Sequence, residues 1–436
     1  MIGIIARKEF QEISREARFR WTAAAVLLLL AAALISSVAG VRRASAERTA
    51  AMEADRREWL AQGPRNPHVA AHFGMYAFKP AAPLALLDRG VETFTGSAIW
   101  IEAHNQNPAQ FRAADDATSM IRFGELTAAT VLQTLVPLLI IVVAFPLFAR
   151  ERETGTLRQL LSIGIAPARL AVGKVAGVLA ALALVLLPAI AIGVVALSLA
   201  SELPLARLLL LGGAYGAYFL ALVAVVIAVS AHASTSRAAL VTLLGFWIAT
   251  TFVIPRAAAD LGERLHPTPT DRQFWAAVNA DMAKRYAGGD VPRRDGVALQ
   301  AGEDYGNRVF DRHFAGLDRG FDEQASVQRI AGVLSPYLAI RDASMSIAGS
   351  DVRHHMHFAR AAELFRRDLQ RYLNTDLTRN AVRGFGYQAG EPLWRNAPRF
   401  TYALPPLQWA LRPVALSLVL LLAWLAVAAW MLARSV

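Results

Sequence analysis

Six long runs of apolar residues constrain the fold of this 436-residue chain more than any other feature. An α-helix rises about 1.5 Å per residue, so a run of about 20 apolar residues crosses the roughly 30 Å of hydrocarbon in a bilayer. The chain is 55% hydrophobic and only 18% charged, which is typical of a membrane protein. The runs that we assign to transmembrane helices are 21–41, 127–149, 170–199, 208–231, 238–255 and 413–433. We therefore predict an all-α polytopic membrane protein with six spans.

The connections between these runs are either short and basic or long and nearly neutral. Lys and Arg outnumber Asp and Glu in the short segments 1–20 and 150–169, whereas the long segments 42–126 and 256–412 contain nearly balanced charges. Positive charge in short flanks marks the cytoplasmic side. We therefore place both termini in the cytoplasm and both long loops outside, where they form a mostly helical extracytoplasmic domain. A signal peptide cleaved near Ala46 is the alternative for the first run.

Residues 1–20 have the pattern of an amphipathic helix. Phe10, Ile13, Ala17 and Trp21 recur at helical spacing, while the charged side chains mostly fall on other faces. Such a helix lies in the membrane interface before the chain turns inward. The alternative is an ordinary charged leader to a signal-anchor helix.

Residues 149–164, ARERETGTLRQLLSIG, form a charged segment between the second and third apolar runs. Its charges cannot lie in hydrocarbon, so the segment contacts either water or a partner. A docking surface combines charge for orientation with a rigid apolar helix, whereas a solvated loop would use the same charges only to fix topology. The candidate coupling residues are Arg150, Glu151, Arg152, Glu153, Gly155, Thr156, Leu157 and Arg158.

Two sequences carry a resemblance to a known family. ARKEF in the N-terminal segment and FARERETGTLRQLLSIGIAPARLAVGK at 148–174 closely resemble the ABC-2 type permeases, the transmembrane subunits of one class of ABC transporters. The matching positions include the Glu-Arg-Glu run, Gly155, Pro167, Arg169 and the pair Gly173-Lys174. The resemblance implies an export permease of the bacterial cytoplasmic (inner) membrane. It also implies a dimer, of this chain with itself or with a related permease, and two copies of a separate ABC ATPase.

The ATP-hydrolysing part is expected in that partner. A P-loop requires G-x-x-x-x-G-K-[ST], and the Gly-Lys pair of this chain is followed by Val175 and lacks the first glycine. We expect no cofactor on this chain, ATP and Mg²⁺ on the ATPase, and no catalytic residue here. The net charge of +11 lies largely beside the membrane, so we expect lipid contacts and no nucleic-acid partner.

The outer loops resemble a narrower subgroup of these permeases. The stretches 72–108 and 348–374 are similar to permeases whose large extracytoplasmic domain has no assigned activity. Substrate identity therefore cannot be transferred from better-known exporters. Two alternatives remain: an ATP-driven complex that moves the outer domain without passing a substrate, and a membrane-anchored binding protein.

Polar residues in the second and fifth runs are candidates for a translocation path. Gln133, Thr134, Thr250 and Thr251 lie in the spans that line the route in ABC-2 relatives. The alternative for each is a hydrogen bond between helices.

A histidine cluster in the second long loop is the weak candidate for a metal site. His354 and His357 are spaced to share a metal on a helix, and His355 lies between them. The more economical interpretation is that Ser350 or Asp351 caps a helix whose first turns carry these histidines. We therefore expect no metal site. The chain has no cysteine, which excludes thiolate ligands.

Overall fold

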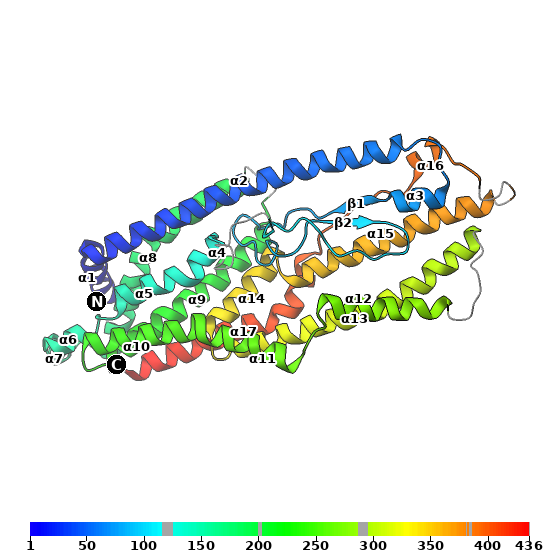
Figure 1. The fold of residues 1–436 in the computed structure, drawn as a ribbon. Coiled ribbons are helices and arrows are strands. Elements are labelled where there is room, and N and C mark those ends of the chain that lie inside the picture. Colours follow the sequence, from blue (N-terminus) through cyan, green and yellow to red (C-terminus); the bar gives the residue numbers. More distant parts are fainter. Residues whose placement is uncertain (116–124, 199–202, 287–294, 381, 383–385, 436) are drawn as a thin grey trace.

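The computed structural model describes all residues except 116–124, 199–202, 287–294, 381, 383–385 and 436, and shows an elongated, almost wholly helical molecule (Figure 1). Among the described residues, six helices are long and apolar enough to cross a membrane. Their bounds are Ala17–Ala61, Ala128–Glu153, Pro167–Ser198, Leu205–His232, Ser236–Leu265 and Leu407–Ser435. The prediction of an all-α protein with six spans is confirmed. The predicted end of the third span, residue 199, lies outside the described residues.

The spans are α2 (Ala17–Ala61), α8 (Pro167–Ser198), α9 (Leu205–His232), α17 (Leu407–Ser435) and two composite helices. The second span runs through α4 (Ala128–Thr130), the π-helical turn η2 (Val131–Leu135), α5 (Val136–Ala144) and α6 (Ala149–Glu153). The fifth runs through α10 (Ser236–Ile248), the π-helical turn η3 (Ala249–Val253) and α11 (Ile254–Leu265). Each composite span therefore contains a π-helical turn, a feature that is frequent at functional sites.

Helix α9 is the centre of the membrane bundle. It is apolar on all sides, and its most apolar window is 78% buried, whereas the windows of α2 and α17 are 28% and 22% buried. It packs against α5, α17 and α14 (Pro336–Ala348). The outer spans therefore retain apolar faces that only lipid or another chain can cover.

Helix α1 (Ile2–Arg15) precedes the spans and packs against the beginning of α8. Glu16 adopts an extended conformation between α1 and α2, so the chain turns there. Ile5 and Ile13 of α1 are buried against the bundle. The single amphipathic helix predicted for residues 1–20 is therefore shorter, because residues 17–20 already belong to α2, and α1 packs against α8 at the end of the molecule that carries both termini (Figure 1).

The opposite end of the molecule is built from both long connections (Figure 1). Helix α2 continues past the first apolar run to Ala61, and its Trp59 packs edge-on against Trp394. A hairpin pairs β1 with β2 antiparallel, with Met75 opposite Ile101. The elements of this outer layer are α3 (Pro67–Phe73), β1 (Met75–Phe78), β2 (Ala98–Ile101), α12 (Asp271–Ala283), η4 (Lys284–Tyr286), α13 (Gly296–Ala331), α15 (Val352–Arg379) and α16 (Glu391–Asn396).

Helix α14 differs from the sequence-based expectation. Residues 256–412 were assigned to the outer loop as a whole, but α14 packs between α9 and α17, and its Ile340, Ala343 and Ile347 belong to the same buried cluster as the spans. Its 13 residues are too short to cross a bilayer. Helix α14 therefore inserts into the outer end of the bundle without crossing the membrane.

Two glycines allow α1 to lie close to α8. A Cβ atom at Gly177 would come within 2.6 Å of the Glu9 Cβ, and one at Gly173 within 2.5 Å of an Ile5 methyl carbon. This small-xxx-small spacing is typical of close helix packing in membranes. We expect Gly177→Val to lower the free energy of unfolding by about 1–3 kcal/mol through overpacking, measured by denaturation in detergent. Gly245→Val is the matched control, because a Cβ there meets no described atom within 4 Å; equal losses in the two variants would contradict the prediction.

Candidate functional site

The charged segment forms two short helices at the end of the molecule where both termini lie (Figure 1). Helix α6 ends at Glu153, and α7 (Thr156–Ser162) begins immediately after Gly155. Gly155 has φ +77°, in the left-handed region that glycine adopts without a Cβ penalty. Thr154 and Thr156 share a hydroxyl hydrogen bond of 2.9 Å across this bend. The bend therefore ends α6 and separates it from α7.

Glu151 faces the protein and not the solvent. The Lys174 ammonium group lies 2.7 Å from the Glu151 carboxylate and 2.8 Å from the Glu9 carboxylate. Lys174 also lies 5.1 Å from the centre of the Phe148 ring. A buried ammonium is costly unless carboxylates pair with it, so these contacts fix the geometry of α1, α6 and α8 together. Lys8 adds a more exposed contact to the same carboxylates.

Arg152 and Glu153 bind the connection between α9 and α10. The Arg152 guanidinium donates to the Ala233 carbonyl at 2.7 Å. Glu153 accepts hydrogen bonds from the Ser236 amide at 2.9 Å and from its hydroxyl at 2.8 Å. A carboxylate at these donors stabilises the beginning of α10. Through Glu151 and Glu153, α6 is thus tied to α1, α8 and α10.

The exposed side chains of this segment include basic and large apolar ones. Arg150 and Arg158 are exposed. Leu161 at the end of α7 and Ile163 after it are 41% and 73% exposed. Leu157 is half-buried and packs toward the bundle. The sequence predicted the segment and its charges but not the exposure of Ile163. Which apolar side chains face outward depends on tertiary packing.

The four polar path candidates lie in or next to the two π-helical turns. Gln133 is buried and donates to the Tyr215 hydroxyl at 2.8 Å, while Tyr218 donates to the Gln133 carbonyl at 3.0 Å. The Thr134 carbonyl accepts a bond of 3.1 Å from Trp247 of α10. Thr250 and Thr251 are buried, and the Thr250 hydroxyl bonds back to the Phe246 carbonyl at 2.9 Å. The Gln133 side chain thus bonds to another helix, whereas the Thr134 hydroxyl bonds to the Thr130 carbonyl of its own span. A translocation path along these four residues stays a prediction.

Helix α14 is bonded directly to η3 and, through Tyr215 of α9, to η2. The Ser335 hydroxyl donates to the Thr250 carbonyl at 2.6 Å, satisfying a carbonyl that the π-helical turn leaves available. Ser344 lies 3.2 Å from the Tyr215 hydroxyl, which in turn accepts from Gln133. Arg207 of α9 binds the Ile347 carbonyl at the end of α14 at 2.7 Å. Helix α14 therefore joins the second and fifth spans to the outer layer.

The histidines singled out in the sequence do not converge. Asp351 caps α15, as predicted, by accepting from the His354 amide at 2.9 Å, and it also binds the His354 Nδ1 at 2.6 Å. The His357 Nδ1 lies 2.9 Å from the Tyr402 hydroxyl. Burial, with Lys79 and Arg112 nearby, lowers the pKa of His355 to about 4. These three rings have different surroundings, and their metal binding stays an untested, weak candidate.

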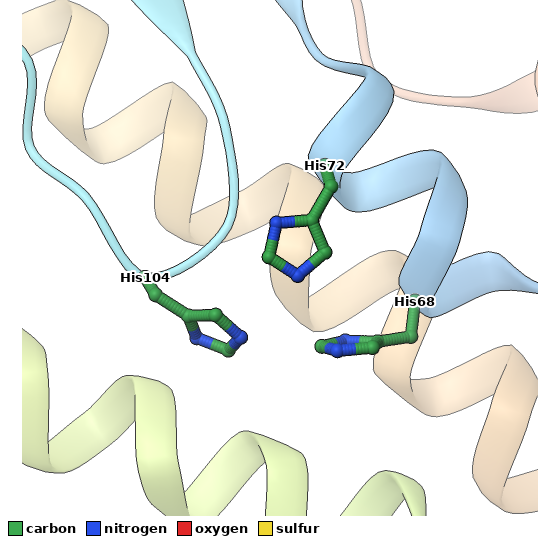
Figure 2. Close-up of side chains that lie close together, drawn as sticks. All are labelled: His68, His72 and His104. Carbon is green, nitrogen blue, oxygen red and sulfur yellow. The ribbon is translucent and has the colours of Figure 1, made fainter.

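A different set of histidines does converge. Among the described residues, His68 and His72 of α3 and His104 after β2 have ligand atoms within 4.8 Å of one another (Figure 2). The sequence signal for two of them was the i, i+4 spacing of His68 and His72, which places both rings on one face of a helix. His104 is more than 30 residues from His72 in the sequence, so helical spacing could not predict that it lies beside them.

The chain is a helical polytopic membrane protein, because it has six membrane-length helices among the described residues. Its charged segment, α6 and α7, lies at the end of the molecule where both chain termini lie (Figure 1). Residues 101–253 match the family model described as ABC-2 family transporter protein, which spans β2 to η3 and includes α6 and α7. Residues 276–403 match a domain of unknown function, DUF3526, which includes α14 and α15. No curated protein matches the chain. The chain thus carries an ABC-2 family transporter domain followed by an additional domain, in agreement with the resemblance seen in its sequence.

Proposed function

We propose that this chain is the permease subunit of an ATP-driven exporter in the bacterial cytoplasmic membrane. A separate ABC ATPase binds the α6–α7 segment from the cytoplasm, and its closure moves the spans so that a substrate crosses the membrane. Two permease chains and two ATPase subunits form the working assembly. The family match supports the permease role and implies an ATPase partner.

The charge distribution supports this orientation. The end of the molecule with both termini carries Arg150, Arg158 and the basic residues of α1, whereas the two long connections are nearly neutral for their length. Positive charge in short flanks favours the cytoplasmic side. The outer layer, with α13 and α15, would then lie outside the membrane.

The bonding of α6 is the observation that carries the proposal. Glu151 binds Lys174 of α8, and Lys174 also binds Glu9 of α1. Glu153 accepts a hydrogen bond from Ser236 at the beginning of α10. Arg152 binds the carbonyl that follows α9. A force applied to α7 would therefore reach the ends of several spans through charged contacts with fixed geometry. A solvated loop that only fixed topology would not need the buried ammonium of Lys174 between two carboxylates.

The apolar face of α7 is the proposed contact with the ATPase. An exposed leucine and isoleucine flanked by Arg158 give an apolar centre with a charged rim, which is the usual composition of a protein interface. We expect the double change Leu161→Asp and Ile163→Asp to reduce ATPase co-purification at least tenfold, since each buried carboxylate would lack a partner. The measurement is retention of a nucleotide-hydrolysing subunit by the tagged chain in mild detergent, identified by mass spectrometry and by its ATPase rate.

Met52→Asp serves as the matched control, because Met52 is also an exposed apolar residue but lies on α2 outside the apolar run. It is expected to leave the retained ATPase unchanged. The proposal fails if the unaltered chain retains no nucleotide-hydrolysing subunit, or if the double variant retains as much as the control. Unchanged thermal melting of the double variant would show that its loss of partner is not a folding defect.

A further inference from the structure

We propose that His68, His72 and His104 bind one divalent transition-metal ion, for which Zn²⁺ is the representative, on the outer layer of the protein. Their ring centroids form a nearly equilateral triangle with sides of 4.8, 5.3 and 5.1 Å. The rings meet between α3 and the loop that follows β2 (Figure 2). This inference does not depend on the transport role, because the three histidines belong to α3 and to the loop after β2 and not to α6, α7 or the π-helical turns.

The backbone holds the three histidines together. Asn66 caps α3 by accepting from the His68 amide at 2.9 Å, and Pro67 begins the helix. The Ala103 amide donates to the Ala71 carbonyl at 3.0 Å, which ties the His104 loop directly to α3. His104 itself has φ +65°, an unusual conformation for a residue with a side chain. Strained residues of this kind cluster at ligand sites.

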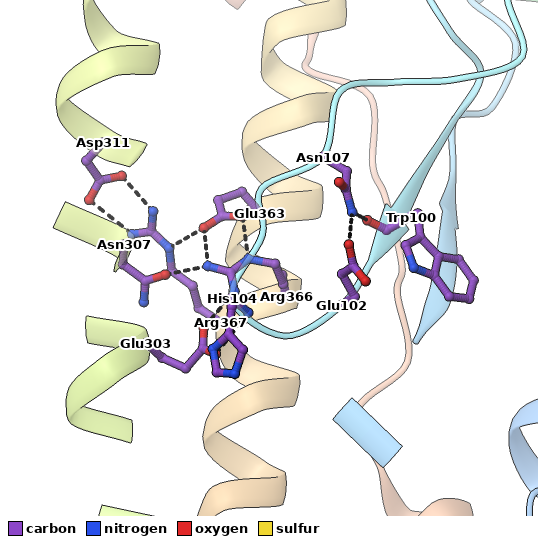
Figure 3. A network of polar contacts seen from close by, with 10 residues as sticks. All are labelled: Trp100, Glu102, His104, Asn107, Glu303, Asn307, Asp311, Glu363, Arg366 and Arg367. Atoms are coloured by element: carbon purple, nitrogen blue, oxygen red, sulfur yellow. Dashed lines mark hydrogen bonds and ion pairs between the residues drawn. The ribbon is translucent and has the colours of Figure 1, made fainter. Parts of the chain in front are cut away.

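A buried carboxylate orients the His104 ring. Glu303 of α13 lies 2.6 Å from the His104 Nδ1 and accepts from its backbone amide at 3.0 Å. Glu303 is itself held by Arg366, 2.8 Å away (Figure 3). With Nδ1 bound to a carboxylate, the Nε2 atom is the one that can coordinate a metal. Histidine ligands of metal ions commonly have such a carboxylate on the second ring nitrogen.

The donor set selects the kind of metal. Three imidazole nitrogens suit Zn²⁺ and its neighbours in the first transition row, and the open fourth position would be occupied by water or another ligand. Zn–N bonds of about 2.0–2.1 Å place the nitrogen atoms of a tetrahedral site about 3.3 Å apart. The side chains therefore need to rotate so that each coordinating nitrogen moves about an ångström toward the centre of the cluster. His72 and His104 are exposed, so they have room for this movement.

The test uses the full-length protein in detergent, made without a polyhistidine tag and stripped of metal. Titration calorimetry with Zn²⁺ is expected to give one site per chain. His72→Gln and His104→Gln are each expected to weaken binding at least tenfold. Co²⁺ in place of Zn²⁺ is expected to give the d–d absorption of a four-coordinate nitrogen site in the unaltered protein and to lose it in both variants.

His266→Gln is the matched control, since His266 is a partly exposed histidine of the outer layer that pairs with Glu323. It is expected to bind Zn²⁺ as tightly as the unaltered protein. Equal melting temperatures of the metal-free variants would separate loss of a ligand from loss of folding. The inference is overturned if the unaltered protein binds no stoichiometric Zn²⁺, or if His72→Gln and His104→Gln bind it as tightly as His266→Gln does.

Discussion

Replacing Lys174 with methionine is expected to lower the free energy of unfolding by about 3–5 kcal/mol, the cost of removing one partner from a buried ion pair. The Lys174 side chain is 1% exposed, and its ammonium group forms ion pairs with both Glu9 and Glu151. Methionine keeps the length of the side chain but leaves two carboxylates close together without that cation. Denaturation of the detergent-solubilised protein would measure the loss.

Lys8→Met is the control for this change. Lys8 contacts the same two carboxylates but is 50% exposed, so its contribution is expected to be about 1 kcal/mol or less. Glu9→Gln combined with Lys174→Met is expected to recover part of the loss, because one of the two unpaired charges is gone. The interpretation is wrong if Lys8→Met and Lys174→Met cost the same.

The sequence was sufficient to predict the membrane class and the six spans, because hydrocarbon imposes a strong and local requirement on helix length and composition. It was not sufficient for α14. That helix has only 13 residues and contains Ser335 at its cap and Ser344 within it, so neither its length nor its composition indicated burial among the spans. Its position follows from hydrogen bonds to α9 and η3, which join residues far apart in the chain.

The candidate sites, too, could be predicted from the sequence only in part. The charged segment could be located from sequence because charge cannot remain in hydrocarbon. The sequence could not show that Glu151 faces Lys174 and that Ile163 faces outward, since both depend on how α1 and α8 pack. The histidine cluster was missed for a related reason. His104 lies beside the other two because the Ala103 amide binds the Ala71 carbonyl of α3 and Glu303 of α13 holds the His104 ring, contacts between residues that are far apart in the chain.

Arg366→Met is expected to have the largest effect in the outer layer, again about 3–5 kcal/mol. Arg366 is 1% exposed, and its guanidinium binds Glu303 at 2.8 Å and Glu363 through two bonds of 2.8 and 2.9 Å (Figure 3). Methionine would leave both buried carboxylates without this partner. The neighbouring Arg367 provides the matched control, because it shares Glu363 but also reaches the exposed Asp311. Arg367→Met is expected to cost about 1 kcal/mol or less, and equal losses in the two variants would contradict this account.

The loss caused by Arg366→Met is also expected to depend on pH. Burial alone would raise the pKa of Glu303, but the hydrogen bond from His104 and the charge of Arg366 lower it from 4.5 to about 2. A carboxyl whose folded pKa is depressed stabilises the fold above its unfolded pKa, and that stabilisation is lost as the pH falls through the folded value. The difference in unfolding free energy between the unaltered protein and Arg366→Met is therefore expected to be full above about pH 4.5 and to shrink toward pH 2, because protonated Glu303 no longer needs a cation. Denaturation curves recorded across this range would measure it, and a difference that stays constant would show that Arg366 stabilises α13 and α15 by packing and not by charge.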